Sequence, residues 1–424
     1  MRLLYVIPRY GAQFTSNVTH GELVRELQGL GLAVDVLSFT TRTGAGGTAG
    51  WGTGFGTERV YRHVQGATLA ERGLGKLAQQ GLHYEYFFSM LKGYLHLTRQ
   101  QAYDLIHIEG TFPLGAVAAL AQHYGGVTVP YVITTTGGDL FRLPGEGYGY
   151  GHYRLPRLLM GLALRRAAWV RANSRLIGRL AIGYGADPQR ITPLPVSIAD
   201  FWYPATAAEL PAYRQACRAQ LAAQHGWQLD RPVIVFVGRL ISLKAPELLI
   251  AALPAIQAQV GPVQVCIVGP SRADPTHGDY LAYLRQHAQQ TGVAQWCTFT
   301  GGLPPEQVRG YLAAADLLAV PSRLEGLNRV VFEAGAVGTP CVISDGAGAA
   351  ELVAAYSNGL VVPAGDVPAL AHAISRLLGS PRALHECSQH AYALACSCSA
   401  AAVARGLVGV YRQVLGGQVA GDRG

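Results

Sequence analysis

Two glutamates near the end of a predicted strand give the strongest indication of chemistry in this sequence. Glu325 and Glu333 are separated by seven residues in the run PSRLEGLNRVVFEA, which covers residues 321–334. A strand is expected before this run, and a helix over 330–337 after Glu325. Glu325 is then expected in the loop and Glu333 in the first turn of the helix. Both carboxylates are predicted to face the space above the strand ends, where open α/β sheets bind ligands.

The backbone between the two glutamates favours a phosphate ligand. The first N–H groups of a helix have no partner inside the helix, and its N-terminus carries a partial positive charge. A sugar nucleotide requires this combination, because amides hold the diphosphate while one carboxylate holds sugar hydroxyls and another holds the ribose diol. The candidate donor-binding positions in this stretch are Gly326, Leu327, Asn328, Arg329 and Val330.

Two cations follow another predicted strand end, at Gly238-Arg239 and Lys244. Arginine offers phosphate oxygens a rigid fork, and lysine offers a mobile point charge. Alone the pair is equally typical of an ordinary surface, but in the same α/β region it supplies the counter-charge that a diphosphate needs. No two aspartates stand two positions apart, so a D-x-D metal clamp is absent. We therefore expect no metal and no cofactor, with the cations and amides stabilising the leaving diphosphate.

The 424 residues that must position these groups are enough for two domains. Strands that alternate with helices predict an α/β protein with parallel, doubly wound sheets. Strands are expected at 3–7, 33–39, 104–108, 131–135, 169–172, 233–237, 265–268, 297–300, 317–320 and 341–344. Helices are expected at 18–30, 77–98, 114–123, 246–259, 280–290, 305–314, 330–337 and 400–415.

Two glycine-rich stretches, 43–57 and 144–153, interrupt this alternation and are expected to be loops. The first contains Gly44-x-Gly46-x-x-Ala49, which formally matches a dinucleotide-binding fingerprint. No helix is predicted directly after it, so a dinucleotide site is not expected there. For both stretches a plain loop and a lid over an acceptor site remain alternatives.

Positive charge is concentrated in one part of the chain. The net charge is +8, and residues 142–190 hold nine arginines against Glu146 and Asp187. This stretch is interpreted either as a solvated basic face or as a surface for an anionic acceptor or an anionic membrane. No nucleic-acid motif accompanies it. No apolar run reaches the ~18–20 residues of a membrane span. A cytoplasmic protein is expected, with peripheral contact at the inner face of the membrane under the second interpretation.

The second half resembles the large GT-B-fold retaining glycosyltransferase family 4, also called glycosyltransferase group 1. The resemblance covers about 233–378 and is carried by the run from Tyr311 to Val342, by Gly348–Val353 and by Asn358–Asp366. It implies a GT-B fold of two Rossmann-like domains facing a central cleft. Residues 1–200 would bind the acceptor and residues 201–398 the nucleotide sugar, and a helix in 399–424 would cross back to the first domain.

The resemblance also implies roles for individual residues. Arg239 and Lys244 would contact the diphosphate, Glu325 the donor sugar and Glu333 the ribose. Retention of the anomeric configuration is implied, and no side chain is an obvious covalent nucleophile. The departing diphosphate is therefore expected to help deprotonate the acceptor on the same face of the sugar.

Three positions depart from the family pattern. Thr136 stands where many members carry a histidine, in the run TTTGGD that ends at Asp139. Asp139 is the candidate acceptor-side catalytic carboxylate, with a loop cap as the alternative. Gly11 is the single glycine of a loop that often has two, and it is placed with Thr136 and Asp139 at the acceptor. The run Gly326-Leu327-Asn328 stands where members often carry Gly-Phe-Gly, and Asn328 either contacts the site or caps the helix.

The predicted activity is transfer of a sugar from a nucleotide-diphosphate-sugar donor to a hydroxyl of a glycan, lipid or small-molecule acceptor. Two other functions fit the same donor pocket. One is a hydrolase or epimerase that acts without an acceptor, and the other is a non-catalytic nucleotide-sugar-binding protein. Product analysis with and without acceptor separates the three.

Overall fold

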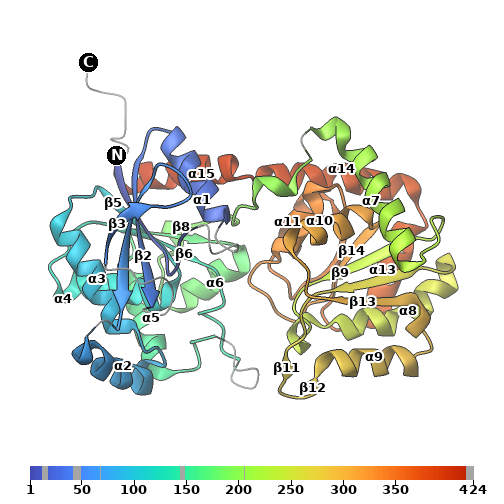
Figure 1. Cartoon of the computed structure of the whole chain (residues 1–424), viewed down its shortest axis with the longest axis horizontal. Helices are drawn as coiled ribbons and strands as arrows, with labels where there is room; N and C mark the ends of the chain where they lie inside the picture. Colours follow the sequence, from blue (N-terminus) through green and yellow to red (C-terminus); the bar gives the residue numbers. More distant parts are fainter. Residues whose placement is uncertain (12–17, 42–48, 67, 144–148, 205, 417–424) are drawn as a thin grey trace. The chain divides into compact units, whose positions relative to one another are not determined.

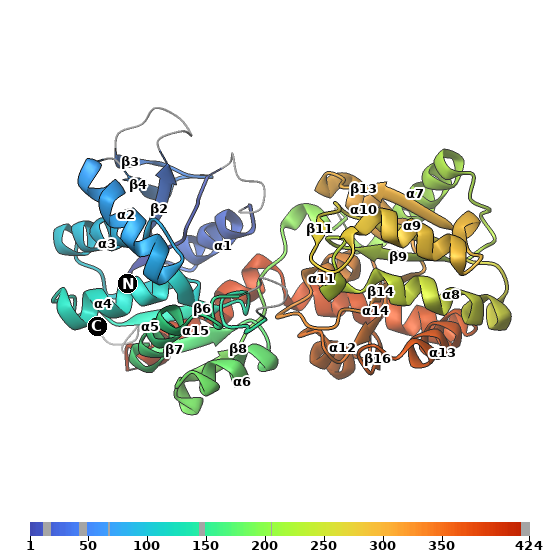
Figure 2. The ribbon, with the colours of Figure 1, turned by 90° about the horizontal axis from the view of Figure 1, so that it is seen from below.

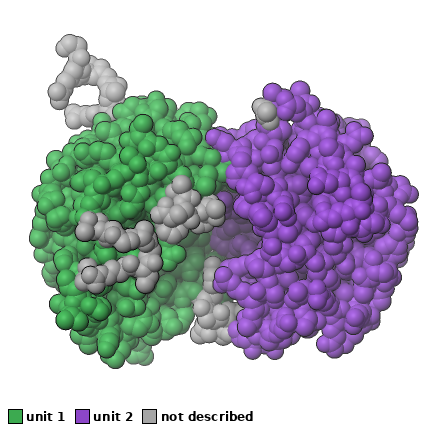
Figure 3. Space-filling model, in the orientation of Figure 1, with its two compact units in different colours: residues 1–199, 400–424 green, residues 200–399 purple. Residues whose placement is uncertain are grey.

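The computed structural model describes residues 1–11, 18–41, 49–66, 68–143, 149–204 and 206–416. The chain divides into two compact units (Figure 3). Unit 1 comprises Met1–Ala199 together with Ala400–Gly424, and unit 2 comprises Asp200–Ser399. Each unit is built on its own sheet, with helices on both faces.

Unit 1 contains an eight-stranded sheet in the order β3-β4-β2-β1-β5-β6-β7-β8 (Figure 1). All neighbouring strands are parallel except β3 and β4, which form an antiparallel edge. The strands are β1 (Arg2–Val6), β2 (Ala33–Thr41), β3 (Gly50–Thr53), β4 (Arg59–Gln65), β5 (Leu105–Glu109), β6 (Tyr131–Thr135), β7 (Trp169–Ala172) and β8 (Ile191–Pro193).

Helices cover both faces of the unit 1 sheet, so its central strands are buried on both sides. Every residue of β5 and β6 is buried, as expected for parallel strands between two helical layers. The helices are α1 (Val18–Gly29), α2 (Leu69–Leu82), α3 (Phe87–Gln100), α4 (Ala116–Tyr124), α5 (Arg154–Arg166), α6 (Arg175–Gly183) and α15 (Ala400–Val414). Although α15 is the last helix in the chain, it lies beside α1 (Figure 1) and shares a core with β1.

Unit 2 contains a six-stranded parallel sheet in the order β13-β10-β9-β14-β15-β16. The strands are β9 (Val233–Val237), β10 (Gln264–Val268), β13 (Cys297–Gly301), β14 (Leu317–Val320), β15 (Cys341–Ser344) and β16 (Gly359–Val362), with a small hairpin of β11 (Ala273–Asp274) and β12 (Gly278–Asp279). The helices are α7 (Leu210–His225), α8 (Pro246–Val260), α9 (Tyr280–Gln290), α10 (Pro305–Ala314), α11 (Arg329–Ala336), α12 (Ala350–Tyr356), α13 (Val367–Leu378) and α14 (Pro381–Ser397).

The helices of unit 2 form two groups: Figure 1 shows α9 on one side of the strands and α10 and α11 on the other, and Figure 2 gives the view from below. Helix α8 packs against α9 and α13, and its apolar residues fill a core with β9 and β10. Helix α10 packs against α7 and α11, and α11 packs in turn against α14. Each group covers apolar strand residues, so polar groups of this unit gather at the strand ends.

Three expected elements are wrong in detail. The single helix expected over 77–98 is two helices, because α2 ends at Leu82 and His83 is its C-cap residue. This residue adopts a left-handed conformation and donates its backbone N–H to the carbonyl of Gln79, which turns the chain. Part of the loop expected over 43–57 is strand β3, whereas residues 42–48, with Gly44 and Gly46, lie outside the described residues. The helix expected over 330–337 begins one residue earlier.

The basic stretch of unit 1 is divided between core and surface. Arg171 is 1% exposed and belongs to the interior, so it does not contribute to a basic face. In α5 the side chains of Met160 and Leu164 are buried, whereas Leu155 and Leu158 are 44% and 65% exposed. No helix within the described parts of the chain is both long and apolar enough to cross a bilayer.

Helix α2 continues this exposed apolar surface. It contacts α5, and it exposes 45% of Leu74 and 63% of Leu77. A Cβ placed at Gly81 of α2 would lie 3.8 Å from Leu155 Cδ2, so the two helices meet at this point. We call Leu74, Leu77, Leu155 and Leu158 the leucine surface.

The stability of unit 1 is predicted to depend on α15. Leu407 of this helix is fully buried in the core that includes Leu3 and Val24. Leu407→Ala is expected to destabilise the unit by about 2–5 kcal/mol, because it leaves a cavity that the surrounding strands cannot fill. Thermal unfolding followed by circular dichroism measures the effect. Arg405→Ala, at an exposed position of the same helix, is the control, and equal unfolding temperatures for the two variants would contradict the prediction.

Candidate functional site

In unit 2, the two predicted charge motifs follow neighbouring strands. Gly238 and Arg239 come directly after β9, and the run that contains Glu325 comes after β14. Strands β9 and β14 pair in parallel, so their carboxyl ends lie at the same edge of the sheet. This edge is where doubly wound sheets bind ligands. The topology therefore brings together two motifs that are more than 80 residues apart in the sequence.

Glu325 is the centre of a cluster of polar side chains. Lys244 Nζ forms an ion pair with Glu325 Oε1, and Asn328 Nδ2 donates a hydrogen bond to Oε2. Ser322 Oγ lies 3.4 Å from Oε2. The side chains of Lys244 and Glu325 are 17% and 20% exposed, so the ion pair is reachable from solvent without being fully hydrated. Both carboxylate oxygens are thus positioned by the protein.

The backbone around the ion pair holds both partners. The amide of Arg323 donates to the carbonyl of Leu243 at 2.9 Å, which ties the loop after β14 to the turn that carries Lys244. Ala245, the next residue, is buried and left-handed with φ 51°. Such a conformation costs roughly 1 kcal/mol or more for a residue with a Cβ. This turn is therefore held by its surroundings, and it fixes where Lys244 points.

Asn328 contacts Glu325 and does not cap α11. It is the N-cap residue of that helix, but its side chain makes no capping hydrogen bond. Of the two interpretations of this position, the structure therefore favours a side chain in the site. Asn328 Oδ1 is buried, and within the described residues it has no hydrogen-bond partner.

Glu333 lies one residue further along α11 than expected. Since the helix begins at Arg329, Glu333 is in the second turn rather than the first. Its carboxylate is 3.4 Å from the Arg329 guanidinium, and its side chain is 14% exposed. Burial raises the pKa of Glu333, and the charges of Arg329 and Lys244 offset part of this effect. Glu325 and Glu333 therefore share the influence of Lys244.

Arg239 is half-buried at the end of β9 and makes no hydrogen bond or ion pair with any residue in the described ranges. Gly238 before it lies against Gly269, and a Cβ at Gly269 would be 1.7 Å from the Gly238 carbonyl oxygen. Glycine is required at position 269 for this close approach. The free guanidinium and the backbone amides of Leu327 to Val330, at and just before the N-terminus of α11, have capacity for an anionic ligand.

A second ion pair beside this cluster was not predicted. Arg323 Nη2 is 2.7 Å from Glu247 Oε1, and the Tyr280 hydroxyl donates to Glu247 Oε2 at 2.5 Å. Glu247 lies in the first turn of α8, directly after the turn of Lys244. The proximity of Glu247 to Lys244 in sequence was the available signal, but one glutamate in a helix does not distinguish a site from a surface.

In unit 1, a pocket of about 480 Å³ opens at the carboxyl ends of β1, β5 and β6. Thr136 and Asp139, which were predicted at the acceptor, both line it. Gly11 is buried with φ 143° and lies two residues after Arg9, but it is not itself among the lining residues. The other lining residues are Ile7, Pro8, Arg9, His20, Glu109, Gly110, Phe112, Gly138 and Tyr150.

Asp139 holds the loop after β5 with one of its oxygens. Asp139 Oδ2 accepts the backbone N–H groups of Thr111 and Phe112 at 2.6 and 3.0 Å. Oδ1 is buried and has no hydrogen-bond partner in the described part of the chain. Burial raises the pKa of Asp139, and the two amide hydrogen bonds counter part of that rise. Asp139 therefore caps a loop, as one interpretation proposed, and also lines the pocket.

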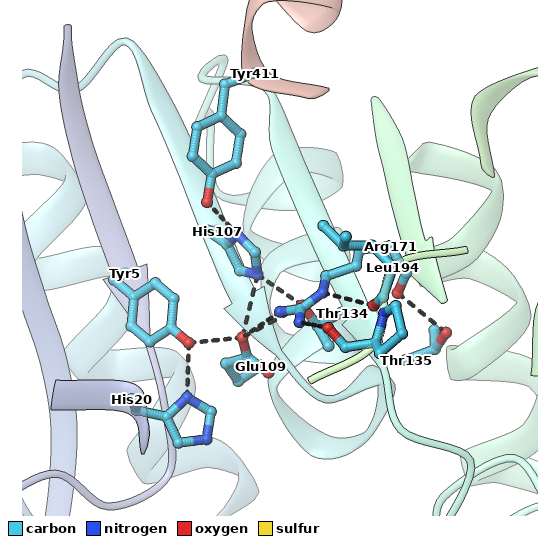
Figure 4. Close-up of polar contacts among 10 residues, drawn as sticks. Tyr5, His20, His107, Glu109, Thr134, Thr135, Arg171, Leu194 and Tyr411 are labelled. Atoms are coloured by element: carbon cyan, nitrogen blue, oxygen red, sulfur yellow. Dashed lines mark hydrogen bonds and ion pairs between the residues drawn. The ribbon is translucent and has the colours of Figure 1, made fainter. Parts of the chain in front are cut away.

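The sequence analysis missed Glu109, the last residue of β5. Glu109 as a whole is 7% exposed and belongs to the pocket wall. Its position at the end of a predicted central strand was a usable signal, because this is where parallel sheets place ligand contacts. Figure 4 shows the polar groups that surround it.

Comparison with known proteins identifies both halves of the chain. Residues 218–394 match the family model of glycosyl transferases group 1. Residues 15–197 match the model of the glycosyl transferase 4-like domain. The first range contains the Glu325 cluster. The second contains those lining residues of the unit 1 pocket that come after position 14 in the sequence.

Curated relatives match over part of their length. A GDP-mannose-dependent alpha-(1-6)-phosphatidylinositol monomannoside mannosyltransferase of Mycolicibacterium smegmatis is 37% identical over 172 residues, which cover 39% of this chain and 43% of that protein. A D-inositol 3-phosphate glycosyltransferase of Nocardia farcinica is 35% identical over 235 residues, covering 55% of this chain and 49% of the relative. The matches thus span about half the length of these relatives or less.

Solved structures match the whole chain. Sucrose-phosphate synthase from Thermosynechococcus elongatus superposes with a TM-score of 0.72 at 20% identity, over 99% of this chain and all of the other. Anabaena HepE in complex with UDP-glucose gives a TM-score of 0.66 at 20% identity, over 97% of this chain and all of HepE. Together with the two family models, these matches show that the chain belongs to the group 1 glycosyltransferases (family GT4) and has their GT-B fold of two Rossmann-like domains.

Proposed function

We propose that the protein is a retaining glycosyltransferase that moves a sugar from a nucleoside-diphosphate sugar to an acceptor hydroxyl. In this proposal unit 2 binds the donor and unit 1 binds the acceptor. The observation that carries it is the contact between Lys244 and Glu325. In a nucleoside-diphosphate sugar, the diphosphate and the sugar are adjacent groups. The residues proposed to bind these two groups are adjacent here.

The charges of the cluster suit this donor. Lys244 pairs with Glu325 and Arg329 with Glu333, and Arg239 after β9 adds one positive charge, so the site carries one excess positive charge before the donor binds. A diphosphate brings negative charge that increases when the bond to the sugar breaks. Arg239, Lys244 and the first amides of α11 stabilise that charge. The departing phosphate oxygen takes the acceptor proton on the same face of the sugar, which gives retention.

The two carboxylates bind the remaining groups of the donor, the sugar and the ribose. Glu325 accepts hydrogen bonds from sugar hydroxyls, and its orientation depends on Asn328 and Ser322. Glu333, one turn into α11, accepts hydrogen bonds from the ribose diol. Gly238 and Gly326 allow the ligand to approach the backbone closely.

The acceptor is proposed to lie in the pocket of unit 1, against Thr136, Asp139 and the loop of Gly11. The relatives support a polyol as the acceptor, since one of them is named for a phosphatidylinositol monomannoside and another for D-inositol 3-phosphate. For the donor, one relative is named as dependent on GDP-mannose, and HepE was solved with UDP-glucose. Thermal shift with GDP-mannose and UDP-glucose tests donor binding, because a ligand stabilises the folded state by RT ln(1 + [L]/Kd). Product analysis with and without acceptor tests transfer.

The two glutamates are predicted to act at different steps. Glu325→Ala is expected to lower transfer by at least about 100-fold, because it removes contacts to the reacting sugar. It should change the affinity for free nucleoside diphosphate by less than about twofold. Glu333→Ala is expected to weaken nucleoside-diphosphate binding by about tenfold through loss of the ribose contacts. Initial rates and calorimetric titration with GDP and UDP measure the two effects.

A matched control for Glu333→Ala exists in the same unit. Glu386 pairs with Arg382 on the surface of α14 at the same four-residue spacing as Glu333 and Arg329. Glu386→Ala is expected to leave both binding and transfer unchanged. Wild-type turnover in Glu325→Ala, or equal loss of nucleotide affinity in Glu386→Ala and Glu333→Ala, would refute the proposed roles.

Transfer is predicted to need no divalent metal. The sequence has no D-x-D pair, and Arg239 and Lys244 lie where a diphosphate needs positive charge. Activity with an excess of EDTA is therefore expected to equal activity without it. Complete loss of activity in EDTA that Mg²⁺ or Mn²⁺ restores would contradict this prediction.

We further propose that the leucine surface contacts an anionic membrane. Exposed Leu77 and Leu158 supply apolar area, while Lys76, Arg154 and Arg165 are exposed on the same two helices. Each basic side chain contributes about 1 kcal/mol at an anionic lipid surface. An acceptor attached to a lipid would be reached from such a surface.

Membrane contact is tested by co-sedimentation with vesicles of phosphatidylcholine, with and without phosphatidylglycerol. The protein is expected to pellet with anionic vesicles at low salt and to be released at 1 M salt, where the Debye length is about 3 Å. The double variant Leu77→Ser/Leu158→Ser should pellet several-fold less. Leu229→Ser is the control, because Leu229 is 63% exposed, as is Leu77, but lies in unit 2. Equally weak pelleting of the wild type under all conditions would exclude the membrane proposal.

A further inference from the structure

Glu109 is a buried carboxylate at the wall of the unit 1 pocket, and the proposed donor chemistry does not use it. It ends the central strand β5, and its side chain is 6% exposed. The pocket wall also contains Phe112 and Tyr150, whose ring centroids are 4.8 Å apart. A charged group beside two aromatic faces is a combination that a purely structural core does not require.

One oxygen of Glu109 takes all the contacts that the described residues make with it (Figure 4). The Tyr5 hydroxyl donates to Oε1 at 2.6 Å, and the Thr134 hydroxyl donates to it at 3.3 Å. His107 Nε2 and Arg171 Nη1 lie 3.2 and 3.8 Å from the same oxygen. Within the described residues, Oε2 forms no hydrogen bond or ion pair. Because Oε1 is held by the protein, Oε2 remains available for a ligand in the pocket.

The surrounding groups are themselves fixed. Arg171, which is 1% exposed, donates through Nε and Nη2 to the carbonyl oxygens of Leu194 and Pro195 at 3.1 and 2.5 Å. His107 Nδ1 is 2.5 Å from the hydroxyl of Tyr411, on α15. These contacts leave the carboxylate little freedom to turn. A fixed hydrogen-bond acceptor loses little entropy when a ligand binds.

The carboxylate is held in its ionised form. Burial would raise the pKa of Glu109, but the contacts with His107, His20 and Arg171 outweigh this effect and lower it well below the usual range. Burial lowers the pKa of His107, and the contact with Glu109 offsets part of this effect. The ion pair of Glu109 and Arg171 is buried, and a protein with no use for it would gain by replacing both residues with apolar ones.

We propose that Glu109 anchors the acceptor: its Oε2 accepts hydrogen bonds from hydroxyls of a ring-shaped polyol whose apolar face lies on Phe112 and Tyr150. An ionised carboxylate oxygen accepts two or more such bonds, and these are stronger than bonds between neutral groups. Asp139 Oδ1, which is buried at the same wall without a partner in the described residues, is a second acceptor for the same ring. This inference rests on the proposed function, in which unit 1 binds the acceptor.

The test measures polyol binding to the full chain without donor. The probes are myo-inositol and methyl α-D-mannopyranoside, with cyclohexanol as an apolar ring that carries one hydroxyl. Saturation-transfer NMR titration is expected to show binding of at least one polyol and no binding of cyclohexanol. Glu109→Asp keeps the charge that compensates Arg171 but withdraws the carboxylate from the pocket, so polyol affinity should fall by about 10- to 100-fold. Glu109→Gln is a second variant that keeps the size of the side chain.

Glu58→Asp is the matched control. Glu58 is also buried in unit 1 and also accepts a tyrosine hydroxyl, from Tyr10 at 2.9 Å, but it does not line the pocket. The Glu58→Asp variant should keep its polyol affinity within about twofold of the wild-type value. Thermal unfolding and titration with GDP and UDP verify that each variant is folded and that unit 2 is intact.

The outcomes separate this inference from the proposed function. Polyol affinity that is unchanged in a folded Glu109→Asp variant, or that falls equally in Glu58→Asp, overturns the role of Glu109. If the wild type binds the donor but binds no polyol, the role of Glu109 is also overturned, and the transferase proposal still stands. Polyol binding that depends on Glu109, in a chain that binds no sugar nucleotide, supports the polyol site and refutes the transferase.

Discussion

The central strands of both sheets are buried on both faces, and this constraint decides where charged groups can be hydrated. Helices cover each face, so a carboxylate or a guanidinium inside the layers has no water to hydrate it. The carboxyl ends of the strands are the positions where backbone loops begin and polar side chains can converge. Glu325 follows β14, Arg239 follows β9 and Glu109 ends β5. The candidate sites of both units arise from this one geometric rule.

The two units use charge differently at these strand ends. In unit 2 the pair of Lys244 and Glu325 is partly exposed, so a ligand can exchange contacts with it at modest cost. In unit 1 the pair of Arg171 and Glu109 is almost fully buried, and Arg171 is held by two backbone carbonyls. Separating a buried pair leaves an uncompensated charge, which is strongly unfavourable. A partly exposed pair is suited to a charged leaving group, whereas a buried pair is suited to a neutral ligand that is only positioned.

Helix α15 connects the end of the chain to the polar interior of unit 1. Its apolar face completes the core beside α1 and β1, and its Tyr411 reaches His107. His107 in turn contacts Thr134 and Glu109, so a residue near the C-terminus helps to orient a carboxylate of the pocket. The integrity of the pocket therefore depends on a helix that is distant from it in sequence.

Local sequence was sufficient for most elements and for the donor motif. Apolar runs of four or five residues predicted β9, β14 and β15, since a buried parallel strand shows this pattern whatever its partners. The donor motif could be recognised from the sequence because Glu325, Asn328 and Glu333 lie within one loop and one helix. Conversely, the break at His83 depends on a single left-handed residue that is not a glycine, and no propensity predicts it.

Only the tertiary structure decided which distant groups meet and which charges are buried. Arg171 counted toward a basic surface in the sequence, but it lies in the core, because β7 pairs with β6 and β8 in a strand order that the sequence does not reveal. Glu109 looked like the end of an ordinary strand until Tyr5, Thr134, His107 and Arg171 converged on one of its oxygens. Periodicity encodes which face of an element is apolar, whereas the pairing of distant polar groups depends on topology and packing, which are properties of the whole fold.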